Sequence, residues 1–222
     1  MKIGILPGSY NPVHVGHLAI ANYLAEYEGF DQIWFLITPQ NPLKKKSDLL
    51  DQEFRKQLLE NSIKGYDKFV ISTIEWDMPQ PSYTINTLQK LRVTRPEDDF
   101  ELIIGTDNWA TFHRWKDYQM IMKNFKILVY PRRGSDRIFI NHPNVQLLKA
   151  PKIEMSSTVI RKAIVEGKDV RFYMPLNTFA AVRDTGFFQD LAAAEAAEKA
   201  AKEAEKAAKD AAEAEENISN TL

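Results

Sequence analysis

Short hydrophobic runs alternate with amphipathic stretches along most of the chain. Six runs rich in branched and aromatic residues have the length of buried strands, at 2–6, 32–37, 69–74, 100–104, 126–130 and 145–148. Apolar residues at helical spacing lie between most of these runs, at 17–28, 51–64, 84–93 and 117–123, and Gly29 and Gly65 follow the first two. This alternation predicts an α/β fold, a Rossmann-like doubly wound parallel sheet with helices on both faces.

The composition changes sharply near residue 191. All 9 glycines and all 11 prolines lie at or before Gly186, whereas residues 192–216 are only alanine, glutamate, lysine and aspartate. Such a composition favours a helix. We therefore expect a folded domain at 1–191 and a C-terminal helical extension at 192–222, rich in alanine, glutamate and lysine and ending in a short polar stretch.

The alanine-rich tail supports two interpretations. Three Glu–Lys pairs at i, i+4 spacing would stabilise a solvated helix: Glu195 with Lys199, Glu198 with Lys202 and Glu205 with Lys209. Alanine at 193, 197, 200, 204, 207, 211 and 214 also has the 4-3 spacing of a shallow coiled-coil seam. Because alanine buries little area, the driving force for association is small. We favour the solvated helix and expect a monomer or a weak homo-oligomer.

Net charge differs between the two regions. The whole chain carries 29 basic and 30 acidic side chains, a formal charge of -1, which gives no reason to expect a nucleic-acid or membrane partner. Residues 192–216 contribute -4, so the remainder carries +3 and suits anionic ligands. Cysteine is absent, which excludes disulfides, thiolate metal sites and cysteine nucleophiles. Since we find no signal-peptide pattern and no run approaching a membrane span, we expect a cytoplasmic protein.

The loop after the first expected strand contains the first candidate site. Ligands of parallel sheets bind beyond the carboxyl ends of the strands. This loop, residues 8–17, holds Gly16 and two histidines, His14 and His17, at the start of the next helix. Free amides and imidazole N–H groups there would cradle a polyphosphate. A lone histidine pair is more often a helix cap or part of the core. A zinc site is disfavoured because no carboxylate or thiolate ligands lie nearby in the sequence. A dinucleotide cofactor site is disfavoured because no G-x-G-x-x-G motif follows the strand.

A second candidate anion site lies near the end of the folded domain. The segment M-S-S-T-V-I-R at 155–161 precedes a helix that ends near Gly167. Its hydroxyl residues are natural N-caps, and Arg161 falls within the first turns. The paired motifs G-S-x-N-P-x-H-x-G-H and S-S-T-x-I-R resemble those of the nucleotidyltransferase superfamily of adenylyltransferases.

Within that superfamily, residues 1–190 look like bacterial nicotinate-nucleotide adenylyltransferases. Three further segments carry the resemblance: P-L-K-K at 42–45, S-Y-T-I-N-T-L at 82–88, and I-G-T-D-N at 104–108 followed by H-R-W at 113–115. Met155 and Thr106 depart slightly from the family pattern. The resemblance implies transfer of AMP from ATP to nicotinate mononucleotide, which yields nicotinate adenine dinucleotide and pyrophosphate.

The resemblance also implies roles for individual residues. The catalytic group would be His14, His17, Lys44 and Arg161. Residues expected to bind ATP are Gly8, Ser9, Asn11, Gly16, Gly105, Asp107, Ser156, Ser157 and Thr158. Those expected to bind the nicotinate nucleotide are Tyr83, Thr84, Trp115 and Arg133. Mg²⁺ would travel with the ATP phosphates and would not occupy a protein metal site.

Three alternatives remain open on the sequence. A sister adenylyltransferase would act on nicotinamide mononucleotide or on phosphopantetheine, because the two terminal motifs are shared across the superfamily. The segments around Tyr83 and Trp115 argue against phosphopantetheine. The third alternative is a nucleotide-binding regulator without catalytic activity, which the complete set of expected phosphate ligands disfavours.

Overall fold

Six parallel strands form one sheet at the centre of the molecule. The computed structural model describes residues 1–39, 49–132, 140–175 and 178–219, except the side chains of 205 and 207–219. The strands are β1 (Lys2–Gly8), β2 (Gln32–Ile37), β3 (Phe69–Ser72), β4 (Asp99–Gly105), β5 (Ile127–Tyr130) and β6 (Val145–Leu147). Their order is β3-β2-β1-β4-β5-β6, and every pairing is parallel. The predicted doubly wound α/β fold is confirmed.

The order of the strands reverses between β1 and β4. These two neighbours pair from Lys2 opposite Asp99 as far as Ile5 opposite Leu102. Both strands continue for three more residues, to Gly8 and to Gly105, outside that register. Their carboxyl ends therefore separate, which opens the crevice where ligands of doubly wound sheets bind.

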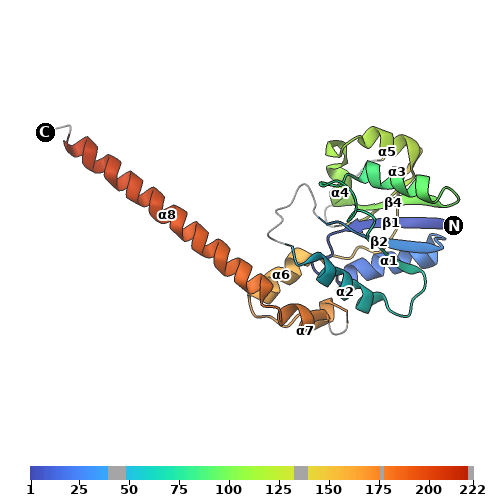
Figure 1. Ribbon diagram of the computed structural model, residues 1–222, viewed down its shortest axis with the longest axis horizontal. Coiled ribbons are helices and arrows are strands. Elements are labelled where there is room, and N and C mark those ends of the chain that lie inside the picture. Colours follow the sequence, from blue (N-terminus) through green and yellow to red (C-terminus); the bar gives the residue numbers. More distant parts are fainter. Residues whose placement is uncertain (40–48, 133–139, 176–177, 220–222) are drawn as a thin grey trace.

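Helices cover both faces of the sheet (Figure 1). The helical elements are α1 (Val15–Tyr27), α2 (Gln52–Ile63), α3 (Thr84–Thr94), α4 (Thr106–Ala110), η2 (Phe112–Arg114), α5 (Tyr118–Asn124), α6 (Ser157–Val165), η4 (Arg171–Tyr173), α7 (Thr178–Arg183) and α8 (Phe187–Ser219). One core cluster contains buried residues of α1, α2, α6 and α7, including Leu24 and Ile160. The cluster on the opposite face contains Ile85 of α3 and Ile121 of α5.

Local sequence explains where these helices begin and end. Asp51 caps α2, because its side chain accepts a hydrogen bond from the Phe54 amide at 3.0 Å. Gly29 and Gly65, which follow α1 and α2, have φ of 70° and 85°, a left-handed conformation that favours glycine. The four predicted helices and six strands are all present within a few residues of their expected bounds.

Three boundaries differ from the sequence prediction by two residues, and one of them is the end of the first strand, which is Gly8 instead of 6. The first helix begins at Val15 instead of 17, so His14 becomes its N-cap. The third strand ends at Ser72 instead of 74, because a turn starts there with the Trp76 amide donating to the Thr73 carbonyl at 2.9 Å. Helices α4 and α7 were not predicted, since five or six residues are too few to show a helical period.

The C-terminal helix α8 starts before the alanine-rich composition does. It begins at Phe187, and Phe188 is buried in the core cluster that contains α1 and α6. The rest of α8 extends away from the body (Figure 1). Lys202 pairs with Glu198 as predicted, whereas Lys199 pairs with Glu203 at 3.7 Å. The expected pair of residues 205 and 209 lies outside the described side chains. In the part of the chain that the structure covers, no helix has the length and apolarity needed to cross a bilayer.

Candidate active site

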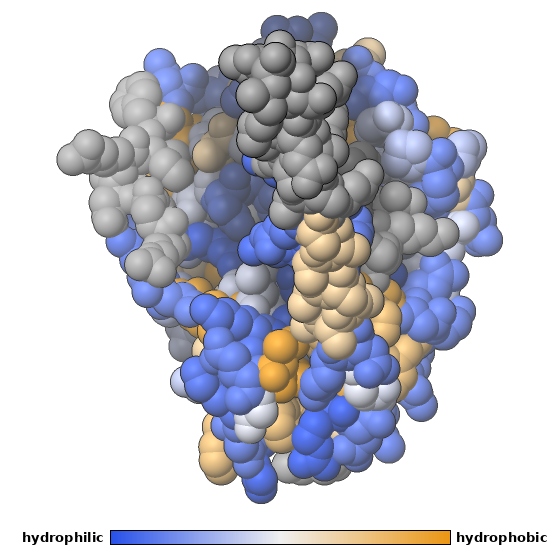
Figure 2. Space-filling model, turned by 90° about the vertical axis from the view of Figure 1, so that its left-hand side faces the viewer, coloured by the Kyte–Doolittle hydropathy of each residue, from blue (hydrophilic) through white to orange (hydrophobic). Residues whose placement is uncertain are grey.

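The candidate site lies at the edge of the sheet formed by the carboxyl ends of the strands. Figure 2 looks onto this edge, where α8 leaves the body, and shows a hollow lined mostly by hydrophilic residues. The loop after β1 and the residues after β4 and β5 meet there. The crevice between β1 and β4 therefore brings the first predicted anion site to the switch point of the sheet.

The loop between β1 and α1 holds His17 in a defined orientation. Tyr10 has a φ of 47°, and its hydroxyl donates to the Leu6 carbonyl at 2.5 Å. The Tyr10 ring contacts the His17 ring edge-on at a centroid distance of 4.9 Å. The His14 backbone amide donates to Nδ1 of His17 at 3.3 Å. Because Nδ1 accepts this bond, a neutral His17 ring carries its proton on Nε2, where it is a donor.

His14 is buried and is held neutral. Its side chain is 2% exposed, and its ring stacks on His17 with centroids 3.7 Å apart. Burial, with a smaller contribution from the Arg132 charge, lowers the pKa of His14 from 6.5 to about 3. Within the described residues, Nδ1 of His14 has no hydrogen-bond partner. A buried polar atom without a partner usually marks a place where a ligand or ordered water binds.

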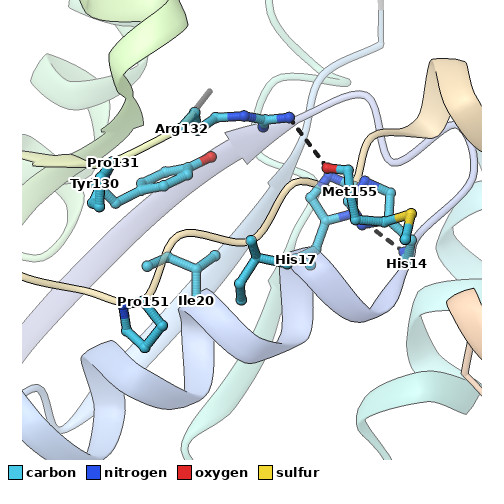
Figure 3. Close-up of a pocket in the computed structure, with 10 residues that line it drawn as sticks. His14, His17, Ile20, Tyr130, Pro131, Arg132, Pro151 and Met155 are labelled. Carbon is cyan, nitrogen blue, oxygen red and sulfur yellow. Dashed lines mark hydrogen bonds between the residues drawn. The ribbon is translucent and has the colours of Figure 1, made fainter. Parts of the chain in front are cut away.

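Gly16 allows this close packing. A Cβ at Gly16 would lie 3.0 Å from Nδ1 of His14 and 3.3 Å from the Cβ of Met155. Figure 3 shows the resulting pocket, with His14 and His17 at the start of α1 and Arg132 reaching over it from the end of β5. The glycine therefore lets the segment containing Met155 lie directly beside the two histidines.

The second motif packs against the first. Ser157 Oγ donates to the Pro12 carbonyl at 3.0 Å across 145 residues of sequence. Arg161 Nη1 donates to the Asn11 carbonyl at 3.0 Å. Ser156 is the N-cap of α6 and accepts from the Val159 amide at 3.3 Å. The two predicted anion-binding motifs thus form one continuous site, with the start of α6 facing the first loop.

The end of β4 contributes a third wall. Asp107 lies two residues after Gly105, and its Oδ2 lies 3.7 Å from Nε of Arg132. A Cβ at Gly105 would lie 2.4 Å from Asp107 Oδ1 and 2.6 Å from Cδ of Arg132, so a larger residue here would displace both side chains. Arg132 also donates from Nη2 to the Met155 carbonyl at 3.3 Å. Of the arginine pair after β5, the predicted Arg133 lies outside the described residues, as does Lys44, whereas Arg132 lines the pocket.

Three of the four residues expected to bind the pyridine nucleotide, Tyr83, Thr84 and Trp115, lie on the face of the sheet covered by α3 and α5. Tyr83 is the N-cap of α3, and Thr84 is its first residue. Trp115 is half-buried and packs on Phe112 with ring centroids 5.1 Å apart. Nζ of Lys116 lies 4.7 Å from the centroid of the Tyr83 ring, so the loop after Trp115 contacts the start of α3. This group sits across the β1–β4 crevice from the histidines.

Arg55 is a buried residue that the sequence prediction missed. It is 1% exposed, and burial lowers its pKa. Its guanidinium donates to the carbonyls of Leu50, Ser9, Thr38 and Pro39 at 3.0, 2.7, 3.0 and 3.3 Å. One side chain therefore ties the first loop to the end of β2 and to the start of α2. Its position on the same helical face as Leu58 and Leu59 was the available signal.

Glu75 is a second missed residue. Its carboxylate is 3% exposed and accepts hydrogen bonds from Ser82 Oγ at 2.9 Å and from Thr87 Oγ1 at 2.7 Å. Burial raises the pKa of Glu75, and the hydroxyls of Thr87, Ser82 and Thr38 partly oppose that change. These bonds hold both sides of the turn that carries Tyr83 and Thr84.

Comparisons with known proteins point to one family. The family model described as cytidylyltransferase-like matches residues 5–163. A protein of Azobacteroides pseudotrichonymphae named a probable nicotinate-nucleotide adenylyltransferase is 65% identical over 176 residues, covering 79% of this chain and 93% of that protein. A Bacteroides fragilis protein of the same name is 49% identical over 175 residues, covering 78% and 87%.

A solved structure shares the fold. The nicotinic acid mononucleotide adenylyltransferase of Plasmodium falciparum, complexed with NaAD, matches with a TM-score of 0.73 at 17% identity. The match covers 85% of this chain and 97% of that one. At this identity the likeness concerns the fold, including the sheet and the helices on its two faces.

Proposed function

Because the chain belongs to the cytidylyltransferase-like family and, within it, to the nicotinate-nucleotide adenylyltransferases, we propose that it transfers the AMP of ATP to nicotinate mononucleotide. The products are nicotinate adenine dinucleotide and pyrophosphate. The observation that carries this proposal is the junction of the two anion-binding motifs, in which Ser157 and Arg161 bond to the loop that holds His14 and His17. Donors for a polyphosphate converge there at the carboxyl edge of the sheet.

The reaction needs positioning more than acid–base catalysis. A phosphate oxygen of nicotinate mononucleotide attacks the α-phosphorus of ATP, and the bond from that phosphorus to the bridging oxygen of pyrophosphate breaks. The second pKa of a phosphate monoester is about 6, so the attacking oxygen is already mostly ionised at neutral pH. We assign the Nε2 proton of His17 to the α-phosphate, where charge builds in the transition state.

The remaining ATP phosphates would face the start of α6. The amides of Ser157 and Thr158 would be donors at the start of this helix, whose Ser157 hydroxyl contacts the first loop, and Arg161 would supply a charge. Lys44 would add a second cation, and His14 would contribute the ring nitrogen that has no partner in the described chain. Gly8, Ser9, Asn11, Gly16 and Ser156 would shape the cradle.

Mg²⁺ would arrive bound to ATP. In the described residues, no group of three or more histidine and carboxylate side chains could hold a metal ion. We expect the ATP phosphates to supply most of its ligands, and the metal would neutralise charge on the leaving pyrophosphate.

The two nucleosides would lie on either side of the β1–β4 crevice. Asp107, close to Gly105, would accept hydrogen bonds from ribose hydroxyls of ATP. Trp115 would stack on the pyridine ring, and the Thr84 amide at the start of α3 would donate to the nicotinate carboxylate. Tyr83 and Arg133 would complete this second subsite.

Release of pyrophosphate with different acceptors tests the proposal. We expect turnover with ATP, Mg²⁺ and nicotinate mononucleotide, and much less with nicotinamide mononucleotide or phosphopantetheine. A preference for either of the other acceptors would identify a sister adenylyltransferase. ATP binding without pyrophosphate release on any acceptor would instead identify a non-catalytic regulator.

A further inference from the structure

Lys116 places a positive charge beside the proposed pyridine subsite. It follows Trp115, and its exposed ammonium lies 4.7 Å from the centroid of the Tyr83 ring. A cation over an aromatic face is attracted to it, which restricts where a flexible lysine side chain points. No ion pair given by the described residues involves Lys116, so its charge is not neutralised by a protein carboxylate there.

The partner surface of Lys116 is held firmly. Tyr83 lies between Ser82 and Thr87, and both of these donate side-chain hydrogen bonds to the buried carboxylate of Glu75. The amide of Thr84, the first residue of α3, has no carbonyl four residues earlier within the helix to bond. The Lys116 ammonium and the Thr84 amide are therefore two donors from different segments that both lie at the start of α3.

We propose that Lys116 is a specificity-determining residue that favours nicotinate mononucleotide over nicotinamide mononucleotide. This inference rests on the proposed function and names the residue that selects its acceptor. The two nucleotides differ in one group, a carboxylate in the acid and a neutral carboxamide in the amide. An ammonium beside the Tyr83 ring attracts the carboxylate by its charge as well as by a hydrogen bond, whereas a carboxamide gains only a neutral hydrogen bond.

The test compares kcat/KM for both acceptors in the wild type and in Lys116→Gln. We expect the variant to lose about tenfold in kcat/KM for nicotinate mononucleotide, which corresponds to about 1.4 kcal/mol. We expect less than a twofold change for the amide acceptor and for the KM of ATP. Turnover of the amide thereby serves as the internal measure of folding.

Two further variants test whether the effect depends on a positive charge at position 116 or only on the net charge of the protein. Lys116→Arg keeps a cation over Tyr83 and is expected to retain the preference for the acid. Lys123→Gln removes an equal charge from α5 at the opposite edge of the sheet and is expected to leave both kcat/KM values unchanged. Added salt is expected to narrow the preference of the wild type more than that of Lys116→Gln.

The outcomes distinguish failure of the role of Lys116 from failure of the proposed function. If the wild type prefers the acid and Lys116→Gln keeps the same ratio, the role of Lys116 is wrong while the proposed function stands. An equal loss of kcat/KM for nicotinate mononucleotide in Lys123→Gln would also overturn the role of Lys116. If the wild type turns over neither pyridine nucleotide, or prefers the amide, the proposed function and the inference both fail.

Discussion

The two edges of the sheet differ in the partners of their buried charged groups. At the amino edge, buried carboxylates face several cations: Asp98 pairs with Arg95 and with the N-terminal amine at 2.8 Å, and Glu101 lies 3.3 Å from Lys126 and 3.8 Å from Lys2. At the carboxyl edge, the buried Arg55 is bonded to backbone carbonyls. Ion pairs neutralise the buried charges of the first edge, whereas the charge of Arg55 at the second edge has carbonyls and no carboxylate as hydrogen-bond partners.

This difference indicates that the amino edge stabilises the fold and the carboxyl edge binds the ligand. Charges at the amino edge satisfy one another and leave little to attract a ligand. The carboxyl edge combines Arg55 and Arg132 with a histidine nitrogen that has no partner among the residues described. An anion that binds there supplies the missing partner, so the edge suits a polyphosphate.

The largest expected effect is on catalysis at the carboxyl edge. Loss of one preorganised donor to transition-state charge typically lowers kcat by about 10²–10³-fold. We expect His17→Ala to show a decrease of that size with little change in the KM for ATP, measured by pyrophosphate release. As a control, His142→Ala alters a histidine before β6 at the amino edge and is expected to leave kcat unchanged. A His17→Ala enzyme with near-normal turnover would remove His17 from the transition state.

The next effect is on stability. Arg55→Met leaves four backbone carbonyls without their buried donor, and we expect a loss of about 3 kcal/mol in the free energy of unfolding, measured with urea. Arg95→Met at the amino edge provides the comparison, because Arg95 is 40% exposed and water can replace its contacts. Its expected loss is smaller. Equal losses of unfolding free energy in the two variants would contradict the view that the buried charge of Arg55 depends more on its partners than the exposed charge of Arg95 does.

Acid is expected to destabilise both edges, for opposite reasons. His14 has a folded pKa of about 3 against an ordinary 6.5, so the unfolded chain binds a proton first and stability falls as the pH drops from 6.5 toward 3. Hydrogen bonds from the N-terminal amine and Arg95 lower the pKa of Asp98 below 3.8, so its contribution is present above 3.8 and is lost as the pH falls through the lowered value.

Variants at the two positions separate these contributions. The urea midpoint of the wild type is expected to fall as the pH drops from 6.5 to about 3, and this pH dependence is expected to be lost in His14→Gln. In Asp98→Asn, only the dependence below pH 3.8 is expected to weaken. A His14→Gln protein with an unchanged profile above pH 4 would show that another group takes up the proton.

Sequence pattern predicted the sheet because its information is local. Strands such as Gln32–Ile37 are continuous apolar runs, and helices such as Gln52–Ile63 have a clear period and a cap at Asp51. The junction of the two anion-binding motifs followed from their resemblance to a family. Spacing alone does not bring Ser157 to Pro12, which lies 145 residues away.

Other features depend on tertiary contacts that no pattern contains. Arg55 bonds to carbonyls of three separate segments, so its partners appear only once the loops are in place. His14 shares its pocket with Met155 and Arg132, which come from distant parts of the chain. The start of α8 at Phe187 was missed because the composition changes only after the aromatic residues that attach the helix to the core.

The smallest expected effect concerns the tail. We propose that residues 1–191 form the catalytic domain and that 192–222 are an accessory extension. A chain ending at 191 keeps Phe188, which packs 5.9 Å from the Arg161 guanidinium, and is expected to retain the wild-type kcat. We expect light scattering to give the monomer mass with or without the tail. A lower mass on truncation would show that the alanine seam associates.

The buried start of α8 makes the helix useful as a rigid spacer. Its 33 residues at about 1.5 Å each give a rod of about 50 Å that begins close to the proposed phosphate site. A fluorophore or surface linker attached to the end of the chain would therefore sit far from the crevice. The enzyme could be immobilised or labelled through its C-terminus with substrate entry left open.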